Sequence, residues 1–262
     1  MVMVNHGLTT DDADRLLDPI VEFPEINAAF ERLRPITDFR KDDSEARILY
    51  ICRRIDPDEK NNRNGDEKSE NLYILKCKIQ APSVLAGGLT TPIAGPNEHT
   101  LAELQALQKF ADTKSPSLPH LVAWKKVIQK EGVNSPMPGG YLAYVVMTLM
   151  PGRDLMALKF WSMEEEQREE IRAAFLVAIK SVWRMGFEPY DCALRNILWE
   201  PETKRISIVD FEHWYPTTRD PINMNEREEM MRWGIVQKPP HAFHWQAFFA
   251  NEGLKKEEID RL

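Results

Sequence analysis

The 262-residue chain lacks any apolar run near the roughly 18 residues that a membrane-spanning helix requires. Its opening stretch, MVMVNHGLTTDDADRLLDPI, also lacks the basic flank and long apolar core of a secretory signal. Only three cysteines are present, an odd number at wide spacing, which argues against a disulfide framework and favours a reducing compartment. We therefore expect a cytoplasmic protein with no membrane contact.

Positive charge is also in short supply. The 34 Lys and Arg residues stand against 41 Asp and Glu residues, which gives a formal net charge of −7. A surface that binds nucleic acid needs excess positive charge to displace the counterions of the phosphates. We therefore expect no nucleic-acid partner.

The first part of the chain is dominated by strand-like patterns. A helical region is expected at about residues 10–33. Strand patterns follow in PITDFR, ARILYICRRI, NLYILKCKIQ, LVAWKKVIQ and GYLAYVVMTLM. Residues 56–70 have no apolar side chain to bury, which predicts a mobile loop. One helix interrupts the strands in GPNEHTLAELQALQKF, where apolar residues recur at helical spacing.

The second part of the chain is predicted to be mainly helical. SMEEEQREEIRAAFLVAIKSVWRMG carries an apolar stripe at helical spacing, with Ser162 and Glu165 spaced as a capping box and Gly186 as the stop. A hairpin follows, and then about 50 residues that include NEREEMMRWG and HAFHWQAFFANEG. These patterns predict an α+β chain with a strand-rich N-terminal lobe, residues 1–149, and a helical C-terminal lobe, residues 150–262.

Polar residues cluster at the open end of the predicted hairpin. Asn196 begins its first strand and Asp210 ends its second, so the hairpin brings these two residues close together. An amide oxygen and a carboxylate there suit Mg²⁺, which takes few protein ligands and prefers oxygen. Asp191, five residues before Asn196, is placed to accept a proton from an attacking hydroxyl.

A cation for phosphate is predicted on the strand NLYILKCKIQ. Lys76 and Lys78 alternate along it and share one face, so either could serve. A lysine that faces a site needs a carboxylate to hold it; Glu103 is the best candidate and Glu98 the second. Glu103 has an alternative role, because Thr100 and Glu103 are themselves spaced as a capping box.

Taken in order, these segments resemble the protein-kinase-like fold. Specifically, they resemble its aminoglycoside-phosphotransferase and choline-kinase branch, as found in small fungal kinase-like proteins. YILK resembles the strand with the phosphate-binding lysine, and HTLAELQAL the helix with its partner glutamate. The other matching segments are YVVMTLMPGRDL at the hinge, DCALRN in the catalytic loop and IVDFE at the metal-binding turn.

The resemblance implies ATP and Mg²⁺ as cofactors, bound between the lobes. Lys76, held by Glu103, would contact the phosphates. The adenine would meet the hinge formed by Met147, Thr148, Leu149 and Met150. The expected activity is ATP-dependent phosphoryl transfer to a hydroxyl of a small metabolite, because the segment after Glu212 is too short for an ordinary activation loop.

The resemblance also assigns the hairpin residues. Asp191 would be the catalytic base, and Asn196 and Asp210 would be the ligands of Mg²⁺. Arg195 is either a helper for phosphate or an ion-pair partner for a nearby acid.

The chain departs from the pattern at three places, and the first two, the missing histidine and the missing glycines, favour an alternative function. Pro189-Tyr190-Asp191 replaces the usual H-x-D, FRKDDSEAR contains no glycine for a phosphate-binding loop, and Glu212 replaces a glycine. An acidic residue at the last position is common in the small-molecule branch. The alternative is a pseudokinase that binds a nucleotide or a protein partner without phosphoryl transfer.

Overall fold

The computed structural model describes residues 10–42, 44–55, 71–83, 87–131 and 135–238. The chain folds into two compact units. Unit 1 comprises Met1–Leu104 and His120–Leu149, and unit 2 comprises Gln105–Pro119 and Met150–Leu262. Each contains helices and strands, so the described chain mixes the two. None of the described helices is both long and apolar enough to cross a membrane.

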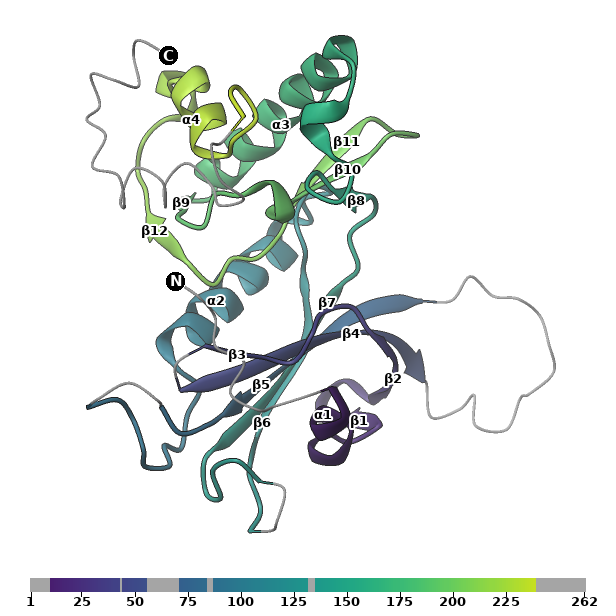
Figure 1. Cartoon of the computed structure of the whole chain (residues 1–262), viewed down its shortest axis with the longest axis vertical. Coiled ribbons are helices and arrows are strands. Elements are labelled where there is room, and N and C mark those ends of the chain that lie inside the picture. Colours follow the sequence, from purple (N-terminus) through teal and green to yellow (C-terminus); the bar gives the residue numbers. More distant parts are fainter. Residues whose placement is uncertain (1–9, 43, 56–70, 84–86, 132–134, 239–262) are drawn as a thin grey trace, which may run out of the picture. The chain divides into compact units, whose positions relative to one another are not determined.

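The described part of unit 1 is built on a seven-stranded antiparallel sheet (Figure 1). Its strands are β1 (Ile20–Phe23), β2 (Ala28–Pro35), β3 (Arg40–Asp42), β4 (Glu45–Ile55), β5 (Leu72–Gln80), β6 (Leu121–Ile128) and β7 (Tyr141–Thr148). They lie in the order β1-β2-β4-β5-β7-β6, and β3 pairs with β4. The predicted strands at β4, β5, β6 and β7 are therefore confirmed.

The expected helical region at residues 10–33 is wrong for most of its length. Helix α1 covers only Thr10–Leu16, and β1, the short 3-10 helix η1 (Pro24–Ile26) and β2 follow. Val21, Phe23, Ala28 and Phe30 are buried because side chains alternate between the faces of a strand. Residues 36–39 of PITDFR form no strand either. The predicted loop at 56–70 lies outside the described residues.

The core of unit 1 lies on one face of this sheet. Phe23 and Phe30 pack edge to face at 5.7 Å between ring centroids, and Phe30 and Tyr73 at 5.4 Å. Cys52 and Cys77 are buried in the same cluster. Cys77 points into this core, so its neighbours along β5 face the other side of the sheet.

Unit 2 contains two helices and five short strands among its described residues after Met150 (Figure 1). The elements are β8 (Arg153–Asp154), η3 (Phe160–Ser162), α3 (Glu165–Arg184), β9 (Phe187–Pro189), η4 (Leu194–Asn196), β10 (Ile197–Glu200), β11 (Arg205–Ile208), β12 (Trp214–Pro216), η5 (Pro221–Asn223) and α4 (Glu226–Arg232). The strands form two small sheets, β11-β10-β8 and β12-β9. The predicted hairpin is confirmed as β10–β11, whereas the β9–β12 pair was missed. HAFHWQAFFANEG lies outside the described residues.

Helix α3 follows the predicted apolar stripe but starts differently. Ile171, Phe175, Ala178, Ile179 and Val182 are all buried. The predicted capping box is wrong, because Ser162 belongs to η3 and the N-cap is Glu164, whose side chain makes no capping bond. The predicted stop is confirmed: Gly186 follows the helix with a φ of +87°.

Helix α2 (Glu98–Thr113) contributes residues to both units. The sequence places residues 105–119 in the N-terminal lobe, whereas the structure groups them with unit 2. Ala106, Phe110 and Leu118 are buried in the unit 2 core, where Phe110 packs edge to face with Phe211 at 4.6 Å. Of the apolar residues at helical spacing, Leu104, Leu107 and Phe110 are buried, whereas Leu101 is 50% exposed.

We predict that none of the three thiols reacts with a thiol reagent in the native protein at neutral pH. Cys52, Cys77 and Cys192 are buried and free. Burial raises the pKa of Cys52 to about 12, and it raises the pKa of Cys77 and Cys192 as well. The reactive thiolate is therefore scarce. A colorimetric thiol assay should detect three thiols only after unfolding, and one fast-reacting native thiol would contradict this.

We predict that Gly152→Ala destabilises the protein far more than Gly186→Ala. A Cβ on Gly152, where φ is +97°, would lie 2.5 Å from the backbone oxygen of Trp199. The expected loss is roughly 2–5 kcal/mol, from left-handed strain plus overpacking. At Gly186 the nearest atom is 3.6 Å away, so only the strain of about 1–2 kcal/mol remains. Equal losses in denaturant unfolding would refute this account.

Candidate functional site

A buried cluster of charges lies on β5 and α2 in unit 1. Lys76 Nζ lies 2.7 Å from Glu103 Oε1, and Lys78 Nζ lies 3.3 Å from Glu103 Oε2. Lys76 is 3% exposed, Lys78 0% and Glu103 2%. The predicted pairing of Lys76 with Glu103 is therefore present, and a second lysine shares the same carboxylate.

Glu45, at the start of β4, completes this cluster. Its Oε1 lies 3.7 Å from Lys78 Nζ, while its Oε2 accepts hydrogen bonds from Tyr141 at 2.6 Å and Thr100 at 3.1 Å. Burial and the nearby Glu45 carboxylate raise the pKa of Tyr141, so its hydroxyl stays protonated and donates. The two carboxylates thus balance the two ammonium groups, which buried charges require. Glu45 and Tyr141 were missed, because only the strand register brings them here.

The alternative role of Glu103 in a capping box is wrong. The side chain of Asn97 accepts a hydrogen bond from the backbone N–H of Thr100 at 2.9 Å and so caps the helix. The Thr100 hydroxyl donates to Glu45 instead. Glu98, the second candidate for the lysine, is exposed in the first turn of α2.

The predicted hinge residues lie at the end of β7. Met147 is buried, and Thr148 forms two hydrogen bonds with His120: its N–H donates to the His120 carbonyl at 3.0 Å, and its hydroxyl accepts from the His120 N–H at 2.9 Å. The strand ends at Thr148, and Leu149 and Met150 follow as irregular chain. Their contact with adenine stays a prediction.

In unit 2, Asn196 connects the predicted base to the end of the hairpin. Its Nδ2 donates to the Asp191 backbone carbonyl at 2.9 Å and to Asp191 Oδ2 at 3.4 Å. The backbone carbonyl of Asn196 accepts a hydrogen bond from the N–H of Val209 at 3.0 Å, and Val209 directly precedes Asp210. Asp210 has a φ of +67°, a left-handed turn that ends the strand. The structure therefore brings these predicted residues to one end of the hairpin.

Arg195 forms an ion pair with Asp191. Its Nη2 lies 2.5 Å from Asp191 Oδ2, four residues apart in the chain. Of the two roles predicted for Arg195, this geometry is that of the ion-pair partner. Phosphate contact by Arg195 stays a prediction.

The small sheet β9–β12 positions the chain on both sides of this site. Its register places Trp214 opposite Pro189, and the Tyr190 N–H donates to the His213 carbonyl at 2.9 Å. The segment that precedes Asp191 is thereby tied to the segment that follows Asp210. Both strands are short, and no sequence pattern indicated the pair.

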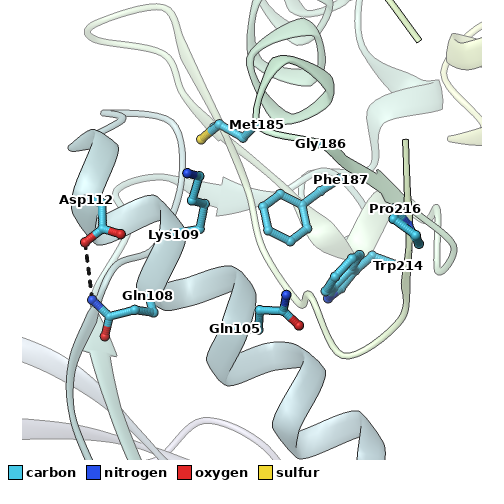
Figure 2. A pocket seen from close by; sticks show the side chains of 9 residues that line it. All are labelled: Gln105, Gln108, Lys109, Asp112, Met185, Gly186, Phe187, Trp214 and Pro216. Carbon is cyan, nitrogen blue, oxygen red and sulfur yellow. Dashed lines mark hydrogen bonds between the residues drawn. The ribbon is translucent and has the colours of Figure 1, made fainter. Parts of the chain in front are cut away.

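A pocket of about 470 Å³ opens beside the same sheet in unit 2 (Figure 2). One wall of the pocket is polar and comes from α2. The other wall is aromatic: Phe187 and Trp214 pack edge to face, with 4.5 Å between their ring centroids. The lining residues are Gln105, Gln108, Lys109, Asp112, Met185, Gly186, Phe187, Trp214 and Pro216. None of them was a predicted site residue.

No family model matches the sequence, and no curated protein matches it. Among solved structures, the chain is similar to the kinase PK-1 of Cydia pomonella granulovirus, with 14% sequence identity and a TM-score of 0.44. The match covers 72% of this chain and 53% of that one, so the chain spans about half the length of the viral kinase. The described part of the chain combines a strand-rich sheet with few helices.

We predict that Glu103→Gln lowers the free energy of unfolding by about 3–5 kcal/mol, the usual cost of removing one partner from a buried ion pair. Lys76 and Lys78 would both lose a carboxylate at 3.3 Å or less. Glu98→Gln, an exposed change in the same helix, should cost less than about 1 kcal/mol. Urea unfolding of both variants provides the measurement, and similar losses would show that the cluster does not stabilise unit 1.

Proposed function

We propose that this chain is a kinase-like phosphotransferase that transfers the γ-phosphoryl group of Mg-ATP to a hydroxyl of a small metabolite. The observation that carries the proposal is the hydrogen bonding of Asn196. It binds Asp191 through its side chain and pairs with Val209, beside Asp210, through its backbone. A base and two oxygen ligands for a cation are the protein groups that phosphoryl transfer needs.

Each residue of this group has a distinct role in the proposal. Asp191 orients the acceptor hydroxyl and takes its proton as the oxygen attacks phosphorus. Because Nδ2 of Asn196 is committed to Asp191, its Oδ1 is the atom assigned to the cation. The Asp210 carboxylate supplies a second hard oxygen, a donor set that fits Mg²⁺. When bound, Mg²⁺ would neutralise charge on the phosphates.

Lys76 supplies the phosphate-binding cation in this proposal. Lys78 is enclosed between Glu45 and Glu103 and has no exposed surface, which makes Lys76 the better choice of the two. Glu103 would hold Lys76 in place, and Lys78 would keep the Glu103 carboxylate paired when Lys76 turns to phosphate. The assignment to the aminoglycoside-phosphotransferase and choline-kinase branch belongs to this proposal, as does the adenine contact at residues 147–150.

A pseudokinase is the second candidate, and two observations favour it. Arg195 already forms an ion pair with the carboxylate of Asp191 at 2.5 Å, which competes with a role as base. The β3–β4 hairpin, with Asp42 opposite Glu45, lies where a glycine-rich loop is expected and contains no glycine. In this case the chain would bind a nucleotide or a protein partner without phosphoryl transfer.

We predict that ATP raises the melting temperature only when Mg²⁺ is present. Ligand at a hundred times its Kd adds about 2.7 kcal/mol, which for a domain of this size is roughly 5–10 °C. The shift should disappear in Asp210→Asn and persist in Glu202→Gln, a control at the turn end of the same hairpin. Absence of any shift in the wild type would refute nucleotide binding.

Hydrolysis of ATP by water then separates the two candidate functions. A phosphotransferase should hydrolyse Mg-ATP slowly without an acceptor, and Asp191→Asn should lower that rate by orders of magnitude while Mg-ATP binding persists. Binding without hydrolysis, and without transfer in a screen of hydroxyl-bearing metabolites, would identify the pseudokinase. Near-normal turnover in Asp210→Ala would exclude the assigned metal site.

A further inference from the structure

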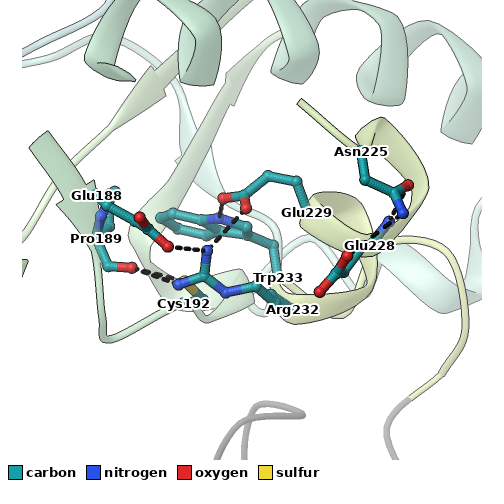
Figure 3. Close-up of polar contacts among 8 residues, drawn as sticks. All are labelled: Glu188, Pro189, Cys192, Asn225, Glu228, Glu229, Arg232 and Trp233. Atoms are coloured by element: carbon teal, nitrogen blue, oxygen red, sulfur yellow. Dashed lines mark hydrogen bonds and ion pairs between the residues drawn. The ribbon is translucent and has the colours of Figure 1, made fainter. Parts of the chain in front are cut away.

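Arg232, at the end of helix α4, donates to the backbone just before the predicted base (Figure 3). Its Nη2 lies 2.9 Å from the carbonyl oxygen of Pro189, two residues before Asp191. The same carbonyl accepts a weaker bond from the thiol of Cys192 at 3.3 Å. The loop that carries Asp191 is therefore held by a charged donor from an element about 40 residues further along the chain.

The second terminal nitrogen of the Arg232 guanidinium, Nη1, is held by two carboxylates (Figure 3). It lies 2.8 Å from Glu229 Oε2 and 3.2 Å from Glu188 Oε1. Glu229 is only 3% exposed, and its second oxygen accepts from the indole N–H of Trp233 at 2.9 Å. Trp233 is buried in the unit 2 core. A continuous chain of contacts thus runs from that core to the Pro189 carbonyl.

The other bonds to this loop come from different elements. The Tyr190 N–H donates to the His213 carbonyl, and Asn196 donates to the Asp191 carbonyl at 2.9 Å. These two bonds fix the loop from the β12 side and from the hairpin side. Arg232 fixes it from α4, at a proline that has no N–H and so cannot anchor itself by donating.

We propose that Arg232, oriented by Glu188 and Glu229, is a positioning residue that fixes the backbone before Asp191 and so sets the position of the Asp191 carboxylate. Arg232 touches neither substrate nor nucleotide in this proposal. The inference rests on the proposed phosphotransferase function, because it assigns Arg232 a role in that reaction. A displacement of about 1 Å in a catalytic group can lower a rate about a hundredfold.

A purely structural role for Arg232 makes a different prediction. In that case Arg232 only neutralises the buried carboxylate of Glu229, and a variant without either charge would behave like the wild type. The double variant Arg232→Met/Glu229→Gln tests this, because it leaves no fully buried charge without a partner. The Glu188 carboxylate, which also loses Arg232, is partly exposed to solvent. The double variant still lacks the guanidinium donor to Pro189.

The matched control is Arg205→Met/Glu200→Gln. This pair joins the two strands of the β10–β11 hairpin at 3.2 Å, at the end away from Asn196. The control loses one Arg–Glu ion pair of unit 2, whereas the Arg232 double variant loses two, those with Glu229 and Glu188. Three quantities are compared: amide hydrogen exchange in residues 187–196, the Kd of Mg-ATP by calorimetry, and the rate of ATP hydrolysis.

We expect the Arg232 double variant to exchange its amides at 187–196 at least about tenfold faster than the wild type, with no such change in the control. We expect its hydrolysis rate to fall by about tenfold or more, and its Kd for Mg-ATP to stay within about threefold. The variant Arg232→Lys keeps the positive charge but loses the two separate donor nitrogens of the guanidinium. Its amide exchange and hydrolysis rates should lie between those of the wild type and the double variant.

Unchanged exchange in 187–196 would overturn the proposal, because the loop would not depend on Arg232. Faster exchange with an unchanged hydrolysis rate would overturn the link to catalysis. If the wild type neither binds nor hydrolyses Mg-ATP, the proposed function fails separately. The exchange data alone then decide whether Arg232 fixes the loop: faster exchange supports this and unchanged exchange refutes it.

Discussion

The charge cluster of unit 1 depends on the ion pairs that Lys76 and Lys78 both form with the Glu103 carboxylate. Two buried lysines approach it from β5, and burial makes each of these charges costly unless an opposite charge lies close. Glu45, with the hydroxyl donors Thr100 and Tyr141, completes the balance. Because successive residues of a helix differ by about 100° in direction, only one rotation of α2 offers Glu103 to both lysines. The charges therefore fix the rotation of the first turns of α2 about the helix axis.

In unit 2, hydrogen bonds to the backbone hold the loop that carries Asp191 in place. The carbonyls of Pro189 and Asp191 and the N–H of Tyr190 each have a partner from a different element. A loop held in this way keeps its shape without regular secondary structure of its own. A carboxylate on such a loop is pre-oriented, which would matter for the proposed phosphoryl transfer because its catalysis depends on positioning together with electrostatic stabilisation.

The parts that could be predicted from the sequence are those with a strong local period. Long apolar runs predicted β4 and β5, the helical period predicted α3, and the polar ends of one hairpin predicted the Asn196 cluster. Residues 20–33 were wrongly predicted to be helical, because their strands are short and charged residues interrupt them. Glu45, Tyr141 and Arg232 could not be found, because they reach the clusters through strand register and long-range packing that no local period records.

Lys78 also bears on how such a protein can change over evolutionary time. A substitution of Lys76 would still leave Lys78 beside both Glu45 and Glu103, so the carboxylates of unit 1 would keep a counter-charge. Loss of Lys76 would then leave one ammonium group for two buried carboxylates, a smaller imbalance than the loss of both lysines. One substitution could therefore remove the phosphate contact proposed for Lys76 and still leave the buried carboxylates one of their two counter-charges.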